Sequence, residues 1–111
     1  NKYHKKIDWT KALKPSMKKN GQFYKGTLRG RQVLESEQSI VIIGDIEEGA
    51  TVASKGNVIV TGTIYGTVIA GASGRRDAVI AALRMQPKKL RIGEVKVKPV
   101  IGGSYSWAKL S

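Results

Sequence analysis

Apolar residues recur at a fixed step of six along the middle of this 111-residue sequence. Eight successive positions at that step, between residues 28 and 70, are all apolar: Leu28, Leu34, Ile40, Ile46, Val52, Val58, Ile64 and Ala70. An α-helix does not keep such a step on one face, because 3.6 residues per turn rotate successive members away from each other. The middle of the chain is therefore not expected to be helical.

A longer repeat contains this six-residue step. The segment 26–31 (GTLRGR) returns 36 residues later as 62–67 (GTIYGT), and 44–49 (GDIEEG) lies halfway, so the period is 18. Runs of β-branched residues at 40–43, 58–61 and 67–69 favour short strands. Three strands per 18-residue coil, each pairing with its equivalent in the next coil, bury a column that no single coil buries alone. We therefore predict an all-β fold, a triangular β-helix of about three to four coils.

Glycines are expected at the corners of the coils, where a positive φ is tolerated. The predicted corners are Gly30, Gly44, Gly49, Gly56, Gly62, Gly66 and Gly71. The same counting predicts that Gln32, Thr51 and Val68 stack on one side of the helix, close to Arg29 and Arg31.

Three segments are expected: a basic tail or linker at 1–22, the β-helix domain at 23–98, and a C-terminal cap or tail at 99–111. Residues 77–84 fit either a helix that stops before Pro87 or a further strand, and the edge left by the preceding coils favours the strand. Strands are also expected at 90–92 and 95–97. Because the sequence begins with Asn1, we expect it to be a piece of a longer protein.

The net charge of +12 is unevenly distributed. Residues 1–25 carry +7 and residues 75–98 carry +6, around a segment 26–74 of −2. Such charge attracts phosphates, anionic lipid or an acidic partner, or simply marks a lysine-rich linker and a solvated face. Nucleic acid is not expected as a partner, since the chain has no zinc knuckle, RNA-recognition signature or aromatic ladder.

Alternation of inward and outward side chains along the strands gives the predicted β-helix an apolar outer face. If Ile40, Ile42, Val58 and Val60 point inward, then Val41, Ile43 and Ile59 point outward, with Phe23 in the same row one coil earlier. An exposed apolar face of this kind marks an interaction surface, or else a terminal segment folds over it. We take Val41, Ile43 and Ile59 as the candidate dimer face.

Catalytic patterns are sparse. The single histidine, His4, lies outside the repeats, and neither a serine–histidine–acid order nor a phosphate-binding loop is present. The absence of cysteine excludes disulfides and thiolate metal sites and favours the cytoplasm. The six-residue step resembles the hexapeptide repeat of left-handed acyltransferases, but these usually depend on a histidine base, and no coil carries one. We expect a non-enzymatic protein without a cofactor or metal.

Residues 24–92 resemble the C-terminal domain of the septum-site-determining protein family MinC. The resemblance rests on 41–50 (VIIGDIEEGA), 56–62 (GNVIVTG), 69–74 (IAGASG), 77–80 (DAVI) and 90–93 (LRIG), of which the AGASG run is the most specific. The aliphatic-glycine repeats alone also fit bactofilins, structural β-solenoids that self-assemble. The six-residue step serves either helix hand, whereas the resemblance implies a right-handed β-helix that dimerises through a hydrophobic face.

The resemblance also implies partners. Members bind the membrane-associated ATPase MinD, which brings them from the cytoplasm to the inner face of the membrane, and they contact the division protein FtsZ so that septa form at mid-cell. The family's MinD-contacting motif reads Arg-Ser-Gly-Gln where Arg29, Gly30, Arg31 and Gln32 stand here. Arg29 and Gln32 match this motif, while Gly30 and Arg31 depart from it. A separate N-terminal domain supplies most of the direct block on FtsZ assembly.

Overall fold

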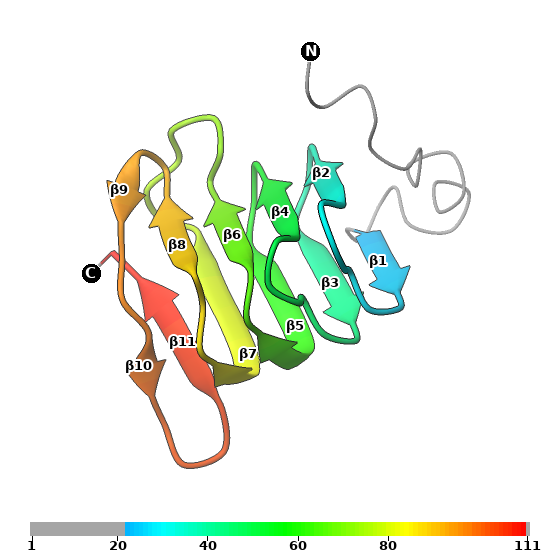
Figure 1. Ribbon diagram of the computed structural model, residues 1–111. Helices are drawn as coiled ribbons and strands as arrows, with labels where there is room; N and C mark the ends of the chain where they lie inside the picture. Colours follow the sequence, from blue (N-terminus) through cyan, green and yellow to red (C-terminus); the bar gives the residue numbers. More distant parts are fainter. Residues whose placement is uncertain (1–21, 111) are drawn as a thin grey trace.

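The computed structural model describes residues 22–110, which form eleven strands and, in that range, no helix (Figure 1). The strands are β1 (Gln22–Lys25), β2 (Val33–Ser36), β3 (Ile40–Ile43), β4 (Thr51–Ser54), β5 (Val58–Ile64), β6 (Thr67–Ala70), β7 (Val79–Met85), β8 (Lys89–Ile92), β9 (Val95–Lys96), β10 (Val100–Ile101) and β11 (Ser106–Lys109). The predicted basic tail lies almost wholly outside the described residues. Within residues 22–110 there is accordingly no helix that is long and apolar enough to cross a membrane.

The strands form two sheets that face each other (Figure 1). Sheet A runs in the order β1-β3-β5-β7-β11-β10 and sheet B in the order β2-β4-β6-β8-β9. The first four strands of each sheet pair in parallel. A narrow third side is made by parallel bridges between Leu28, Ile46 and Ile64, continued by the pairing of Ile64 with Met85. The chain visits the three sides in turn through four coils, so the predicted triangular β-helix is confirmed.

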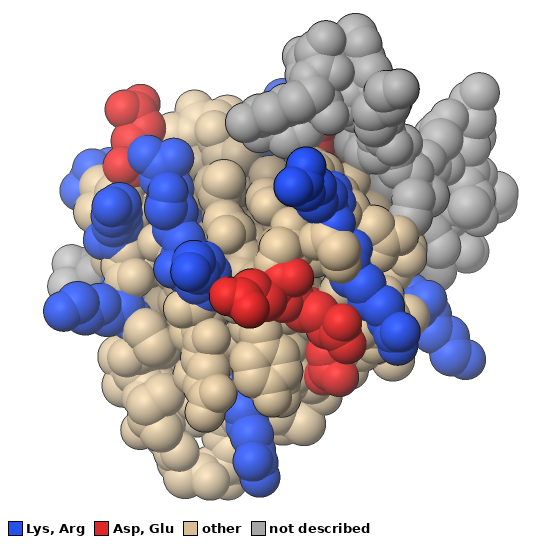
Figure 2. Space-filling view, viewed as in Figure 1, with Lys and Arg blue, Asp and Glu red and all other residues tan. Residues whose placement is uncertain are grey.

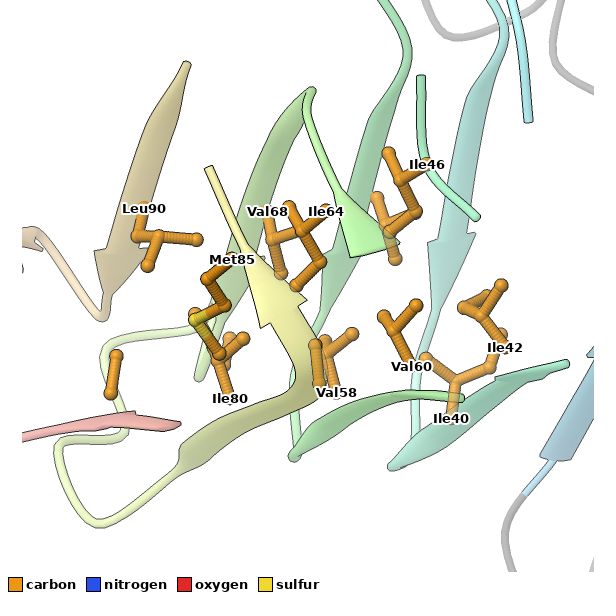
Figure 3. Packing of buried hydrophobic residues seen from close by; sticks show 14 of the residues in the cluster. Ile40, Ile42, Ile46, Val58, Val60, Ile64, Val68, Ile80, Met85 and Leu90 are labelled. Carbon is orange, nitrogen blue, oxygen red and sulfur yellow. The ribbon is translucent and has the colours of Figure 1, made fainter. Parts of the chain in front are cut away.

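The core is the column of side chains enclosed by the three sides (Figure 3). All eight residues of the six-residue step are at most 1% exposed. They stack on equivalent residues of the neighbouring coils, as Ile40 does on Val58 and Val58 on Ile80. Burying one such aliphatic side chain stabilises the fold by about 1.5–3 kcal/mol, so the column is the main source of stability.

The 18-residue period holds from the first coil to the second on all three sides, but from the second to the third only on sheet A and the third side. On sheet B, Thr51 pairs with Val33 eighteen residues earlier but with Thr67 sixteen residues later, because the corner at Gly66 is shorter by two residues. The predicted row of Gln32, Thr51 and Val68 is therefore wrong. Val68 pairs with Val52 and is fully buried.

An insertion follows the third coil. Val58 pairs with Ile80, twenty-two residues later, and the loop at 71–78 absorbs the extra length. Beyond it, residues 79–85 form strand β7 along the edge of β5, so the strand prediction is confirmed and the helix alternative is wrong. The strands expected near 90–92 and 95–97 appear as β8 and β9.

The glycine corners have two different physical causes. Positive φ occurs at Gly30, Gly44, Gly49 and Gly71, as predicted, but not at Gly56, Gly62 and Gly66. At these three positions a Cβ atom would collide with the coil beneath. At Gly66, for example, it would lie 2.6 Å from the carbonyl oxygen of Glu47. The prediction of positive φ is thus wrong for these three glycines, which allow close stacking of the coils instead.

The C-terminal end of the stack is closed by antiparallel strands. Strand β11 pairs with β7, so that Ala108 lies opposite Ile80 and Ser106 opposite Ala82, and both β11 residues are buried. Strand β10 pairs with β11, and on the other sheet β9 pairs with β8.

Candidate protein-binding surfaces

The corner between the third side and sheet B in the first coil is a tight turn formed by Arg29–Gln32. The backbone N–H of Gln32 donates to the carbonyl oxygen of Arg29 at 3.1 Å, and the backbone N–H of Arg29 donates to Oε1 of Gln32 at 2.8 Å. Gly30 has a φ of 59°, whereas no described non-glycine residue has a positive φ. This combination defines a type II′ turn, which needs glycine at its second position. Gln32 therefore fixes the backbone that carries Arg29.

The two arginines of this turn, Arg29 and Arg31, are exposed. The Nε atom of Arg29 lies 4.0 Å from Oε2 of Glu47, the residue one 18-residue step later. In the next coils the same ridge carries Glu48, 3.9 Å from Nζ of Lys88, and the half-exposed ring of Tyr65. Figure 2 shows acidic side chains between two groups of basic ones on this face. The ridge thus alternates in charge, and exposed ion pairs of this kind cost little to break.

The outer face of sheet A is apolar, as predicted. Phe23, Val41 and Ile59 lie side by side on β1, β3 and β5, and Ile43 stands in the adjoining row. The exposed fractions are 36% for Phe23, 43% for Ile43 and 44% for Ile59, while Val41 is half-buried. The predicted residues therefore form one continuous surface.

This face extends further than sequence reasoning predicted. Ala81 on β7 continues the row of Ile59, Leu83 shares the outer face of β7 two residues further on, and Trp107 on β11 lies opposite Ala81. The ring of Tyr105 stands 5.5 Å from that of Trp107 and closes a hollow of about 250 Å³ lined by Ile59, Ala81 and Leu83 among others. Alternation along 79–85 was the available signal for Ala81 and Leu83. No local signal brings Tyr105 and Trp107 to this face, because an antiparallel return strand places them there.

The described residues contain no group of three or more His, Cys, Asp or Glu side chains that could hold a metal ion. The hydrogen bond from Nε of Arg75 to Oδ1 of Asp77, at 2.6 Å, lowers the pKa of Asp77 and raises that of Arg75. This pair lies on the exposed loop at 71–78, at the opposite end of the stack from the Arg29 turn.

The chain falls in the class of small β-helix domains, here with a charged corner turn and an apolar flank, and comparison with known proteins identifies the family. Residues 22–100 match the family model for the septum formation inhibitor MinC, C-terminal domain. The chain belongs to this family, as the sequence resemblance predicted.

Individual relatives agree. The chain is 46% identical over 77 residues to a probable septum site-determining protein MinC of Agathobacter rectalis, covering 69% of this chain and 32% of that protein. It is 47% identical over 77 residues to the corresponding protein of Persephonella marina, covering 69% of this chain and 39% of that protein. The chain thus spans about a third of the length of the curated relatives it matches.

A solved structure shares the fold. A chain of the MinC:MinD cell division protein complex of Aquifex aeolicus superimposes with a TM-score of 0.71 at 36% identity, covering 80% of this chain and 78% of that chain.

Proposed function

We propose that this chain is the partner-binding part of a division-site inhibitor. It binds a MinD-type ATPase, contacts the tail of FtsZ, dimerises, and so helps to keep septa from forming at wrong sites. The observation that carries the proposal is the Arg29–Gln32 turn, an exposed arginine on a fixed corner where the family's MinD-contacting motif stands. The solved MinC:MinD complex, which contains a chain 36% identical to this one, supports the same partner.

The physical argument for this turn is preorganisation. Two hydrogen bonds between Arg29 and Gln32 hold the turn before any partner arrives, so little backbone entropy is lost on binding. The guanidinium of Arg29 has one long contact, to Glu47, that a partner carboxylate can replace. Arginine also presents several donors in a plane, which suits recognition of carboxylates at interfaces.

Dimerisation is proposed through the outer face of sheet A, at Val41, Ile43 and Ile59. Contiguous exposed apolar surface on a soluble domain marks a protein interface, and this face runs across β1, β3, β5 and β7. Membrane association follows indirectly, from the cytoplasm, through the ATPase partner. The module is proposed to act by binding.

Reversal of charge at Arg29 tests the partner site. Binding of MinD to the immobilised chain in the presence of ATP should fall more than tenfold in Arg29→Glu, because a repulsive carboxylate replaces the exposed guanidinium. Arg76→Glu is the matched control, since Arg76 is an equally charged, exposed residue on the 71–78 loop. Equal binding by the Arg29 variant and the wild type, or equal loss in both variants, contradicts the assignment. The same pull-down with the FtsZ tail as prey tests the FtsZ contact.

End-to-end assembly, as in bactofilins, is the alternative. What supports the division-inhibitor proposal over it is the mismatch between the two ends of the stack. The first coil ends in parallel strands β1 and β2, whereas the last ends in the two-residue antiparallel strands β9 and β10. Pro99, which lacks an N–H donor, follows β9 closely, so this end is a poor template for another coil.

A further inference from the structure

Four basic side chains gather on the outer face of β8 and β9, in the last coil. The antiparallel register of β8 and β9 places Arg91 opposite Lys96. The backbone N–H of Val97 donates to the carbonyl oxygen of Leu90, so the same register continues beyond β9. It places Lys89 opposite Lys98. Residues two apart on a strand share a face, so the four form a two-by-two array. Figure 2 shows basic side chains gathered over this part of the molecule.

Within the part of the chain that the structure describes, no acidic side chain is paired with this array, although Glu94 lies in the turn between β8 and β9. None of its four members makes an ion pair there, and the buried Nε of Arg91 has no hydrogen-bond partner. The nearby Asp77 is already bound to Arg75. Like charges directly opposite on neighbouring strands destabilise a sheet, so the fold itself gains nothing from the arrangement. An external anion would relieve it.

Exposed aliphatic side chains stand directly beyond the array in the sequence. Lys98 is followed by Pro99 and then by β10, whose Val100 and Ile101 are 47% and 67% exposed. Strands β9 and β10 are the last strands of their sheets, so both lie at the same end of the stack (Figure 1). The cations on sheet B and the exposed aliphatics on sheet A thus share the end of the stack opposite to the Arg29 turn.

We propose that this end of the β-helix binds directly to an anionic bilayer, with Lys89, Arg91, Lys96 and Lys98 on the lipid phosphates and Ile101 in the headgroup region. A two-dimensional array on an open sheet face matches a plane of headgroups. Three of its four members are lysines, and the outer face of β8 and β9 has no aromatic side chain on which a nucleic-acid base would stack. Basic clusters combined with exposed apolar groups are typical of membrane-surface binding.

The test measures cosedimentation of the full chain with vesicles of phosphatidylglycerol and phosphatidylcholine in equal parts, against vesicles of phosphatidylcholine alone. Wild type should bind only the anionic vesicles, and less as salt is raised. K89Q/K96Q/K98Q should lose about fivefold in affinity for each cation removed, roughly a hundredfold in all. Ile101→Ser should lose affinity severalfold, and neither variant should have a lower urea midpoint than the wild type.

The matched control is K5Q/K6Q/K11Q, which removes the same charge from the basic tail. A loss in this control as large as in K89Q/K96Q/K98Q would overturn the proposal, as would wild-type binding by K89Q/K96Q/K98Q. Tighter binding of single-stranded DNA or polyglutamate than of the anionic vesicles, at the same salt, would also overturn it. K89Q/K96Q/K98Q should still bind MinD, and Arg29→Glu should still bind vesicles, so failure of this proposal and failure of the proposed function are distinguishable.

Discussion

Gly62 lies where β5 bends from sheet A to the third side, close to the coil beneath it. A Cβ at this position would stand 2.6 Å from the carbonyl oxygen of Gly44 and would also collide with the carboxylate of Asp45. That carboxylate accepts a hydrogen bond from the backbone N–H of Thr63 at 2.8 Å. Lack of a side chain at Gly62 therefore keeps two coils at hydrogen-bonding distance.

Replacement of this glycine should destabilise the fold. Gly62→Ala should lower the free energy of unfolding by about 1–3 kcal/mol, the usual cost of forcing atoms into a packed site. Urea denaturation measures the change. Gly103→Ala is the control, because a Cβ at Gly103 meets nothing within 4 Å and its φ is not positive. Equal stability of the two variants would show that the coils are not so closely spaced at Gly62.

The Arg29 turn shows what a residue pattern can and cannot predict. The family motif located Arg29 and Gln32, but the role of Gln32 in holding the Arg29 backbone appears only in the structure. Glu47 lies near Arg29 and follows it by one 18-residue step, so the repeat alone could have predicted that the two residues are neighbours. Gly56, Gly62 and Gly66 were predicted as corners for the wrong reason, because steric contact between coils leaves no mark in a single residue's identity.

At the scale of elements, the six-residue step predicted the strands and their inward faces well. Each coil repeats the same local problem of burying one apolar residue per side, so sequence periodicity and structure coincide. The insertion at 71–78 interrupts the six-residue step, so the step does not predict how β7 pairs. The register of β7 is set by its pairing with the free edge of β5. The return of β11 against β7 had no signal of its own, because a strand's choice of partner is a tertiary matter.

Strand β11 should be essential to the closed end of the core. Ala108 is fully buried opposite Ile80, whereas its neighbour Lys109 is exposed on the other face of the strand. Ala108→Asp buries an unpaired carboxylate and should lower the free energy of unfolding by more than about 3 kcal/mol. Lys109→Asp should change it by less than about 0.5 kcal/mol. Urea denaturation of both variants checks this, and similar stabilities would place β11 outside the core.

The whole molecule separates three kinds of surface around one apolar column. A charged ridge runs from the Arg29 turn, an apolar face covers sheet A, and a basic array lies at the far end on β8 and β9. The distribution of charge along the sequence predicted that residues 75–98 are basic. It did not predict that four of these basic side chains lie side by side, because that follows from the antiparallel pairing of β8 with β9.

The mass of the chain in solution tests most directly whether the outer walls of this β-helix bind proteins. Sedimentation equilibrium of the wild type should give twice the 12.1 kDa of one chain, independent of concentration. Ile59→Asp should give the mass of one chain, because a carboxylate in the centre of an apolar interface is desolvated without a partner. Tyr65→Asp, at an equally exposed position off sheet A, should stay a dimer. A monomeric wild type, a mass that grows with concentration, or an Ile59→Asp dimer would contradict the account.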